Sequence, residues 1–350
     1  MPLLDSPLAF GRMPRKGKPV PGTLRWGILG PGFISTKQTE DLLGNGFAVT
    51  AVGSRSEASA REFADRFGIP TVHGSYRALV EDPDVDIVYI GTPHSLHYEQ
   101  AVLALEAGKH VLLEKAFTVN AEQAAVLVEL AEASGLVLLE AMWTRFLPHM
   151  VRIREMIAAG TIGEVRTLIA DHNQKLPSDP KHRLNDPALA GGALLDLGIY
   201  PVSFAWDVFG APATIQASAS MSLTGVDRQT AIILGYENGA QAVLHTALDT
   251  SGPNTAMILG SDGWIAIDSV WYTPTGFTVF DSDGAVVERY EQEVSPRGMQ
   301  FQAAELERLV DAGLTAGTTL PPTETVAIMG TLDAIRKQIG LEYPADIMKV

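Results

Sequence analysis

The sequence predicts two folded parts: an α/β domain built on a parallel sheet, followed by an α+β domain with an open, mainly antiparallel sheet. Two observations lead to this prediction. Up to about residue 148, short apolar runs alternate with segments of helical periodicity, whereas beyond it β-type runs follow one another with few helices between them. The chain has 350 residues and is 46% hydrophobic, which is enough for two packed cores.

In the first part, each strand candidate is apolar along its length and is followed by a helix candidate. Strands are expected at 24–29, 48–52, 86–90, 110–113 and 136–139, and helices at 34–43, 58–67, 96–107 and 121–133. Strands that are apolar on both faces and separated by helices form a parallel sheet covered on both sides, through right-handed crossovers. We assign residues 23–148 to this domain and residues 1–22 to a polar N-terminal arm.

The second part, residues 149–350, carries hairpin signals between its strand candidates. Asn-Gly or Asp-Gly pairs stand at 238–239, 262–263 and 283–284. Strands are expected at 165–170, 215–221, 229–236, 241–248, 257–259 and 277–280, and helices near 193–209, 302–311 and 323–339. An open sheet leaves one face uncovered, so we expect a substrate domain that also forms a homodimer or homotetramer.

Charge and composition exclude several classes of protein. The formal net charge of −15 argues against nucleic acid and anionic membranes as partners, because both require a basic face. No stretch approaches the roughly 18 to 20 consecutive apolar residues of a membrane-spanning helix, and the arm places its basic residues after its apolar patch, the reverse of a secretory signal. The chain has no cysteine, which excludes disulfides and thiolate chemistry. The cytoplasm is the expected location.

A glycine turn stands between the first strand and the first helix candidate. Gly30 suits a tight turn, Gly32 suits close approach of a pyrophosphate, and the small Ser35 suits close packing of the helix. Phe33 and Ile34 open that helix, whose N-terminus attracts phosphate. The turn predicts a dinucleotide-binding Rossmann domain, and the alternative is an ordinary glycine turn.

The end of the second strand candidate indicates which dinucleotide binds. It reads Ser54-Arg55-Ser56 and offers no Asp or Glu to hold a ribose 2′-hydroxyl. A cation beside hydroxyl donors suits a 2′-phosphate, so the expected cofactor is NADP, with NAD as the second choice. The alternative is a solvated Arg55 at a helix start.

Further polar residues follow the third strand candidate, at the sheet edge where parallel α/β sheets bind ligands. Thr92-Pro93 is expected to border the nicotinamide. His94 and His97 lie three residues apart, but no third metal ligand is in view. We therefore expect His97 to line the cofactor site, and no metal to bind.

The next two strand ends carry the expected chemistry. Glu114-Lys115 closes one strand, and a loop with Trp143 and Arg145 follows the next, so both loops face one crevice and are expected to contact the cofactor. Lys115 can place a positive charge near a reacting oxygen and, if partly desolvated, has a pKa below its solution value. The alternative for Lys115 is a surface lysine at a strand end.

In the second part, the apolar segment 191–200 holds a carboxylate and a phenol four residues apart. If the segment is helical, Asp196 and Tyr200 share a face, as an acid/base pair requires. Because Pro201 cannot continue a regular helix, we expect an irregular helix at Tyr200 or a restart at Pro201. The alternative is a half-buried core tyrosine beside a capping or ion-paired aspartate.

In chain order, these motifs resemble one known family. Gly30-x-Gly32, Thr92-Pro93, Glu114-Lys115, the segment 140–146, Arg183-Leu184 and the segment 191–200 look like the glucose-fructose oxidoreductase/inositol dehydrogenase/rhizopine catabolism (Gfo/Idh/MocA) family. The resemblance covers nearly the whole chain beyond the arm. Within the family, the segments around Trp143 and Tyr200 most resemble the dimeric dihydrodiol dehydrogenase and NADP-dependent D-xylose 1-dehydrogenase branch.

The resemblance implies roles for several residues. It makes Lys115 and Tyr200 the catalytic pair, Asp196 a residue that binds substrate or tunes Tyr200, and Trp143 a wall of the sugar pocket. It also implies that Arg55 meets the 2′-phosphate.

Other residues near these motifs complete the expected pocket. His172 and Arg183 are expected to supply polar contacts to the substrate. Trp271 and Tyr272 can supply aromatic faces to a sugar ring, but core packing is favoured because they lie in an expected strand region. The family usually has proline after the Glu-Lys pair, where this chain has Ala116.

These expectations combine into one function with two alternatives. A cation beside Tyr200 favours its phenolate, which can remove the proton of an alcohol while hydride leaves for the nicotinamide. We expect an NADP-dependent oxidoreductase that acts on a sugar, polyol or cyclic diol. The alternatives are an oxidoreductase that recycles a tightly held cofactor between two sugars, and a non-catalytic dinucleotide-sensing regulatory protein on the same fold.

Overall fold

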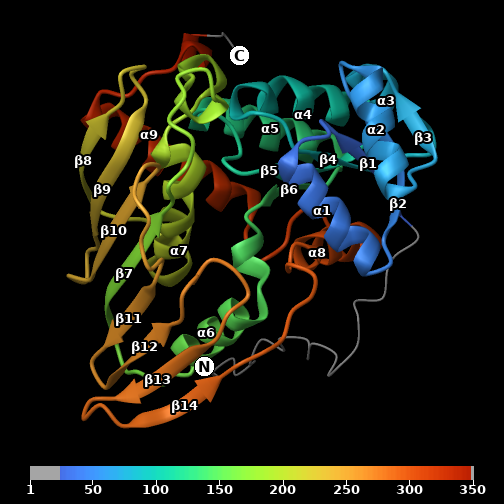
Figure 1. The fold of residues 1–350 in the computed structure, drawn as a ribbon. Coiled ribbons are helices and arrows are strands. Elements are labelled where there is room, and N and C mark those ends of the chain that lie inside the picture. The colour runs from blue at the N-terminus through green and yellow to red at the C-terminus, as the bar shows by residue number, and fades with distance from the viewer. Residues whose placement is uncertain (1–23, 348–350) are drawn as a thin grey trace, which may run out of the picture.

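The computed structural model describes residues 24–347, so the expected arm at 1–22 lies outside the described residues. These residues form two sheets with helices packed on and between them (Figure 1). The N-terminal sheet has six strands and the C-terminal sheet has eight. Both expected fold classes are confirmed.

The N-terminal sheet is parallel throughout, in the order β3-β2-β1-β4-β5-β6. Its strands are β1 (Arg25–Leu29), β2 (Ala48–Gly53), β3 (Thr71–His73), β4 (Ile87–Ile90), β5 (His110–Glu114) and β6 (Leu138–Ala141). Its helices are α1 (Phe33–Gly44), α2 (Glu57–Phe67), α3 (Tyr76–Val80), α4 (His97–Glu106) and α5 (Ala121–Ser134). The strand order reverses between β1 and β4, and the crevice at their carboxyl ends is where such sheets bind ligands.

The sequence analysis missed two elements of this domain, β3 and α3. They are three and five residues long. Elements this short do not complete enough of a period for an apolar pattern to be recognised.

The C-terminal sheet has the order β14-β13-β12-β11-β7-β10-β9-β8, and every neighbouring pair is antiparallel except β7 with β10. Its strands are β7 (Val165–Asn173), β8 (Thr214–Met221), β9 (Asp227–Gly235), β10 (Gln241–Ala247), β11 (Ala256–Gly260), β12 (Gly263–Ile267), β13 (Phe277–Asp281) and β14 (Val286–Tyr290). The sequence analysis missed β12 and β14. Residues 271–272, expected in a strand, lie in the turn between β12 and β13.

The helices of the second part hold the two sheets together. They are α6 (Pro148–Ala158), α7 (Ile199–Phe209), α8 (Gln300–Asp311) and α9 (Pro322–Ile339). Helix α9 packs against α5 and β8, and α8 packs against α1. The indole N–H of Trp26 in β1 donates to Glu307 of α8 at 2.8 Å. Two helices from the expected second domain therefore also complete the first.

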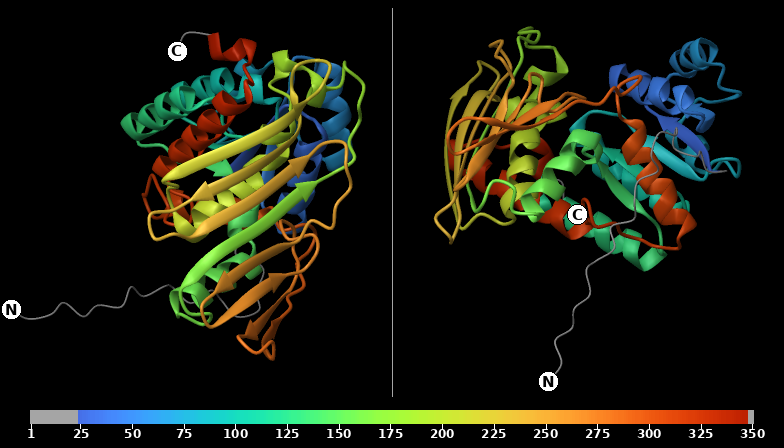
Figure 2. Two further views of the ribbon diagram at one scale, coloured as in Figure 1. Left: turned by 90° about the vertical axis from the view of Figure 1, so that its left-hand side faces the viewer. Right: turned by 90° about the horizontal axis from the view of Figure 1, so that it is seen from below.

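One face of the C-terminal sheet is covered by α7 and α9, whereas no helix of residues 24–347 covers the other face, which the left view of Figure 2 shows. On the open face, Ile233, Val243, Ile169 and Met257 are partners across β9, β10, β7 and β11. All four are exposed. We call these four residues the sheet row.

Within the described chain, one segment is long and apolar enough to cross a membrane. It is Pro187–Phe209, and 89% of its most apolar window is buried inside the protein. A core helix passes the same test of length and composition.

Candidate active site

The segment that carries the expected acid/base pair is a π-helix followed by an α-helix. Leu194–Gly198 forms the π turn, and α7 begins at Ile199. Pro201 has no N–H and its ring crowds the carbonyl four residues earlier, so a wider turn ahead of it relieves both conflicts. The expected irregularity therefore lies just before Tyr200, and regular α-helical stacking of Asp196 on Tyr200 does not occur.

Asp227 and Tyr343, two residues far away in the sequence, hold the start of the π turn by hydrogen bonds, and we call this pair of contacts the clamp. Gly192 has φ +119°, and a Cβ there would lie 2.2 Å from Oδ1 of Asp227. The Oδ2 of Asp227 accepts the N–H of Leu194 at 2.8 Å, and the hydroxyl of Tyr343 donates to the carbonyl of Gly191 at 2.5 Å. Asp227 lies on β9 and Tyr343 follows α9, and since neither belongs to a motif, the sequence analysis missed both.

Lys115, just beyond the end of β5, reaches across the crevice to this segment. Its Nζ donates to the carbonyl of Asp196 at 2.6 Å, lies 3.8 Å from Oδ1 of Asp196 and is 5.0 Å from the ring centre of Tyr200. The peptide bond between Lys115 and Ala116 is cis. The structure thus brings together the three residues expected to be catalytic, from two parts of the chain.

Lys115 and Asp196 form a buried ion pair. Burial lowers the pKa of Lys115, but the carboxylate of Asp196, with smaller effects of Tyr200 and Glu114, raises it above its usual value. Burial raises the pKa of Asp196, but Lys115 and Arg183 bring it well below its usual range. The expectation that desolvation lowers the pKa of Lys115 is wrong, because the neighbouring charges outweigh burial.

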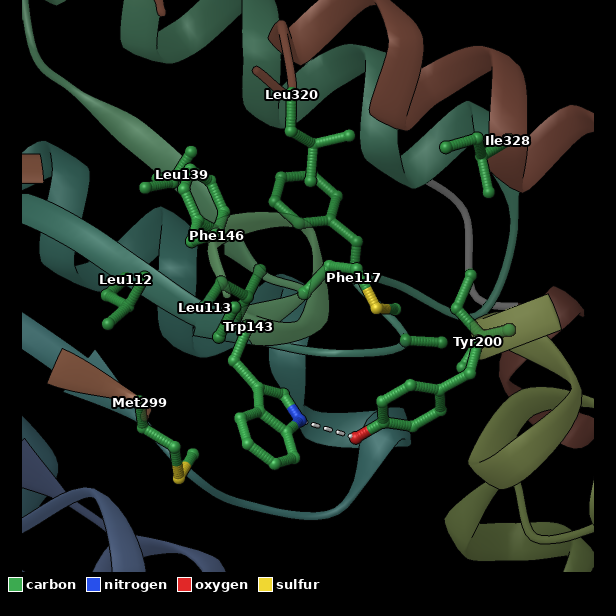
Figure 3. Close-up of a cluster of buried hydrophobic side chains, with 14 of the residues drawn as sticks. Leu112, Leu113, Phe117, Leu139, Trp143, Phe146, Tyr200, Met299, Leu320 and Ile328 are labelled. Carbon is green, nitrogen blue, oxygen red and sulfur yellow. Dashed lines mark hydrogen bonds between the residues drawn. The ribbon is translucent and has the colours of Figure 1, made fainter. Parts of the chain in front are cut away.

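Tyr200 keeps its proton at neutral pH. Burial raises the pKa of its phenol, and the nearby Lys115 offsets this only in part. The hydroxyl accepts a hydrogen bond from the indole N–H of Trp143 at 2.9 Å (Figure 3). The expected phenolate is therefore not the resting state, and the protonated phenol is able to donate a proton.

Aromatic side chains wall the site around Tyr200. The rings of His172 and Tyr272 stack with centres 3.7 Å apart, and they lie 4.9 Å and 5.3 Å from the ring of Tyr200. Burial lowers the pKa of His172 to about 3, so its ring is neutral. Trp271 is a core residue stacked on Phe204, as expected, whereas Tyr272 belongs to the site.

Arg183 reaches the site and Arg145 does not. Arg183 is half-exposed and its NH1 lies 3.2 Å from Oδ1 of Asp196. Arg145 is buried, and its guanidinium is held by Asp207 at 2.9 Å and Glu324 at 2.5 Å. The expected cofactor contact of Arg145 is wrong, because its donors are already used in a buried ion-pair cluster.

His97 joins two loops of the crevice and does not face a ligand. Its Nδ1 lies 2.9 Å from the carbonyl of Ala116, and its Nε2 lies 2.9 Å from the carbonyl of Thr92. The ring is fully buried. The expected cofactor contact of this side chain is therefore replaced by a structural role. The Nδ1 of His94 lies 3.0 Å from the carbonyl of Ala190 in the other part of the chain.

The turn between β1 and α1 fits a dinucleotide phosphate. Gly30 has φ +86°, and a Cβ there would lie 2.6 Å from Cγ2 of Thr92. A Cβ at Gly32 would have open space around it, because its nearest neighbour, the carbonyl oxygen of Gly91, would be 3.9 Å away. The hydroxyl of Ser35 donates to the carbonyl of Gly30 at 2.6 Å and holds the turn. A Cβ at Gly91 would lie 2.3 Å from that same hydroxyl, a packing requirement that the sequence analysis missed.

The start of α1 is open to an anion. No side chain caps it, its first turn has no acidic residue, and Phe33 at its first position is 76% exposed, with Ile34 partly buried behind it. The N–H groups of a first turn have no partner inside the helix, so they and the helix dipole attract phosphate.

The end of β2 leaves Arg55 available for a ligand. The hydroxyl of Ser54 accepts the N–H of Ser56, and the hydroxyl of Ser56 caps α2. Arg55 is exposed, and none of the carboxylates in residues 24–347 pairs with it. The residues present therefore fit a 2′-phosphate at this position.

Glu114 lies behind Lys115. Its carboxyl accepts a hydrogen bond from the hydroxyl of Tyr89 at 2.6 Å and another from the backbone N–H of Lys115 at 3.2 Å. Burial raises its pKa to about 7. Thr92 and Pro93 follow β4 at the same sheet edge. No group of three metal-ligating side chains occurs in the described part of the chain.

The arrangement can carry out proton-coupled oxidation or reduction of an alcohol or carbonyl. A bound nicotinamide dinucleotide supplies hydride transfer. Tyr200 is placed to exchange a proton with a substrate oxygen, and Lys115, fixed by Asp196, is placed to stabilise negative charge on that oxygen. Trp143 orients the phenol through its N–H.

The crevice and its proton-transfer cluster define the chain as an oxidoreductase with a dinucleotide-binding Rossmann domain. Residues 24–142 match the model of the oxidoreductase family with an NAD-binding Rossmann fold, and residues 150–266 match that of the GFO/IDH/MocA C-terminal domain. The chain belongs to the Gfo/Idh/MocA oxidoreductase family, which confirms the resemblance.

Several characterised proteins are similar over most of their length. D-xylose 1-dehydrogenase (NADP(+)) of Hypocrea jecorina is 38% identical, with 93% of this chain and 94% of that protein covered. The trans-1,2-dihydrobenzene-1,2-diol dehydrogenase of Bos taurus is 35% identical, with 92% and 99% covered. Among solved structures, KijD10, a 3-ketoreductase from Actinomadura kijaniata in complex with NADP and TDP-benzene, has a TM-score of 0.79 at 28% identity, with 91% and 98% covered.

Proposed function

We propose that this chain is an NADP-dependent dehydrogenase or reductase that transfers hydride between the nicotinamide and a small ring-shaped sugar, polyol or cyclic diol. The observation that carries the proposal is the buried Lys115–Asp196 ion pair against Tyr200, opposite the dinucleotide turn. Two similar proteins act on D-xylose and on a dihydrobenzene diol. Both compounds carry adjacent hydroxyls.

The walls of the site suit such a ring. Tyr272, stacked on His172, and Trp143, bonded to Tyr200, form an aromatic wall beside the apolar side of such a ring, and Asp196 and Arg183 offer an acceptor and donors to its hydroxyls. Positioned in this way, one hydroxyl reaches Tyr200.

The direct test is absorbance at 340 nm with NADP or NADPH. We expect a change with at least one member of a panel of aldoses, polyols, dihydrodiols and their carbonyl counterparts. Silence across the panel would count against the proposed reaction.

A second candidate is an oxidoreductase that recycles a tightly held cofactor between two sugars. It is favoured by an aldose-aldose oxidoreductase from Caulobacter crescentus, complexed with glycerol, which has a TM-score of 0.80 at 25% identity and coverage of 90% and 97%. Cofactor that stays bound through gel filtration would support this candidate. Free exchange of the cofactor would support the first.

For cofactor preference, Arg55→Ala should raise KM for NADP about 10-fold or more while KM for NAD changes little, because one charge-assisted pair to the 2′-phosphate is lost. The control is Arg61→Ala on the surface of α2, where the arginine pairs with Glu57. Equal ratios of the two KM values in parent and Arg55→Ala would contradict the role of Arg55.

We also propose that the protein is a homodimer and works in the cytoplasm. The sheet row is a continuous apolar surface, and two copies related by a two-fold axis would bury it against itself. The cytoplasm supplies NADP, and fractionation of cells that produce the protein tests the location.

A further inference from the structure

Arg297 lies over the active site on a segment that none of the sequence motifs includes. It belongs to the strap, residues 291–299, that links β14 to α8. Its exposed guanidinium lies over the indole of Trp143, with 5.1 Å from Cζ to the ring centre. Because the indole N–H is bonded to Tyr200, the guanidinium is one indole ring away from the catalytic hydroxyl.

The backbone around Arg297 is held by a buried anchor. The carboxyl of Asp41, fully buried in α1, accepts the N–H of Arg297 at 2.8 Å and the N–H of Met299 at 2.6 Å. Met299 belongs to the buried cluster around Trp143 (Figure 3). The place of Arg297 at the site is therefore set by the fold and not by a chance surface contact.

The charged groups at the site are mainly positive, although the chain has a net charge of −15. Lys115, Arg183 and Arg297 are the cations. The acidic groups are the ionised carboxylate of Asp196 and the carboxyl of Glu114 behind Lys115, whose pKa burial raises to about 7. Asp171 also faces this region, but its carboxyl accepts the N–H groups of neighbouring backbone and amide groups. No carboxylate of residues 24–347 lies within ion-pair distance of the Arg297 guanidinium.

We propose that Arg297 binds an anionic group at the end of the substrate remote from the reacting hydroxyl, so that acidic sugars are preferred substrates. A guanidinium presents a planar set of donors that matches a carboxylate or a phosphate ester, and stacking on an indole removes part of its hydration in advance. The proposal rests on the proposed function and names its substrate class.

The kinetic test compares D-glucuronate and D-glucose 6-phosphate with D-glucose. The wild-type kcat/KM for the better of the two acids should exceed that for D-glucose about 10-fold or more, and Arg297→Gln should reduce this ratio to near one. Arg297→Lys should keep part of the preference. Arg289→Gln, which removes an equal charge from an exposed arginine of β14 paired with Asp268, should leave the ratio unchanged.

A binding test keeps the proposal independent of turnover. The NADPH-loaded protein should gain thermal stability from D-glucuronate or D-glucose 6-phosphate at concentrations where D-glucose has little effect, and Arg297→Gln should remove the gain. The proposal is overturned if the acids bind no better than D-glucose, or if Arg297→Gln acts by raising KM for NADP. If no sugar is turned over yet the acids still bind through Arg297, the proposed reaction fails and this inference stands.

Discussion

Burial shifts the pKa values of the expected catalytic pair in opposite directions: it lowers that of Lys115 and raises that of Tyr200. It favours the neutral form of both Lys115 and Tyr200. Lys115 has the carboxylate of Asp196 beside it and stays charged, whereas Tyr200 has only the Lys115 ammonium over its ring, which offsets burial in part, and stays protonated. A fixed cation next to a proton-holding phenol is the state that donates a proton to a carbonyl oxygen. In the oxidative direction, the positive charge of an oxidised nicotinamide would add to that of Lys115 and favour the phenolate.

The proton-transfer role of Tyr200 is tested by Tyr200→Phe. We expect kcat to fall about 10² to 10⁴-fold, the usual contribution of a positioned acid/base group, with KM for NADP unchanged. Tyr236→Phe is the matched control, because it removes the hydroxyl of a half-buried tyrosine outside the site. Near-normal kcat in Tyr200→Phe would contradict the mechanism.

A buried carboxyl of β6 makes stability depend on pH. Burial raises the pKa of Glu140 from 4.5 to about 7, with a hydrogen bond from Thr325 as its partner. The folded state therefore binds the Glu140 proton more tightly than the unfolded state does. The contribution of this group to the free energy of unfolding is full below pH 4.5 and is lost as pH rises to about 7. That loss is on the order of 3 kcal/mol.

Glu140→Gln should remove this part of the pH dependence. In denaturant titrations at pH 5 and pH 8, the drop in free energy of unfolding should be smaller in Glu140→Gln than in wild type by on the order of 3 kcal/mol. Thr325→Val should instead move the drop to higher pH, because the hydrogen bond that lowers the pKa of Glu140 is lost. The same drop in wild type and Glu140→Gln would refute this assignment.

At the scale of the element, the π turn is shaped by groups far away in sequence. Asp227 on β9 binds its first N–H, and Tyr343 binds the carbonyl of Gly191 just before it. These contacts aim Asp196 at Lys115. A helix of this composition would otherwise follow the regular α-helical path until Pro201 ended it.

Gly192→Ala tests whether this clamp supports activity. The positive φ and the approach of Asp227 should together cost about 2 to 4 kcal/mol of stability, and kcat should fall as Asp196 and Tyr200 shift. Gly135→Ala is the control, because Gly135 also has a positive φ but has nothing within 4 Å of its Cβ position. It should cost about 1 kcal/mol and leave kcat as in wild type. Equal kcat in the two variants would argue against the clamp.

At the scale of the whole molecule, α7 and α9 cover one face of the C-terminal sheet, and α9 also packs against α5 of the first domain. The covered face is buried on the side of the Rossmann domain, so the site of Lys115 and Tyr200 lies between two sheets that share a core. Among residues 24–347, no helix packs over the sheet row on the outer face. An apolar surface of this kind is stabilised when a second copy covers it.

Val243→Glu should convert a dimer to a monomer. Val243 is central in the sheet row, and a carboxylate there would lose its hydration in the interface. Light scattering after gel filtration measures the mass. Leu314→Glu is the control, because Leu314 is also exposed but follows α8, away from the sheet. A monomeric wild type, or a dimeric Val243→Glu, would contradict the proposal.

The sequence alone predicted much of the fold. Apolar periodicity and glycine spacing predicted the parallel sheet, most of its strands and the turn at Gly30, because those signals are local in the chain. The same motifs, through their resemblance to the family, predicted Lys115, Asp196 and Tyr200 as the catalytic residues.

Only the tertiary structure decided the rest. It placed Arg145 in a buried ion-pair cluster, turned the segment before Tyr200 into a π-helix held by Asp227, and brought Arg297 over Trp143. It also set the charge states of Lys115 and Tyr200. The physical reason is that burial and the distances between charges depend on contacts between segments far apart in the chain, and no local pattern encodes them.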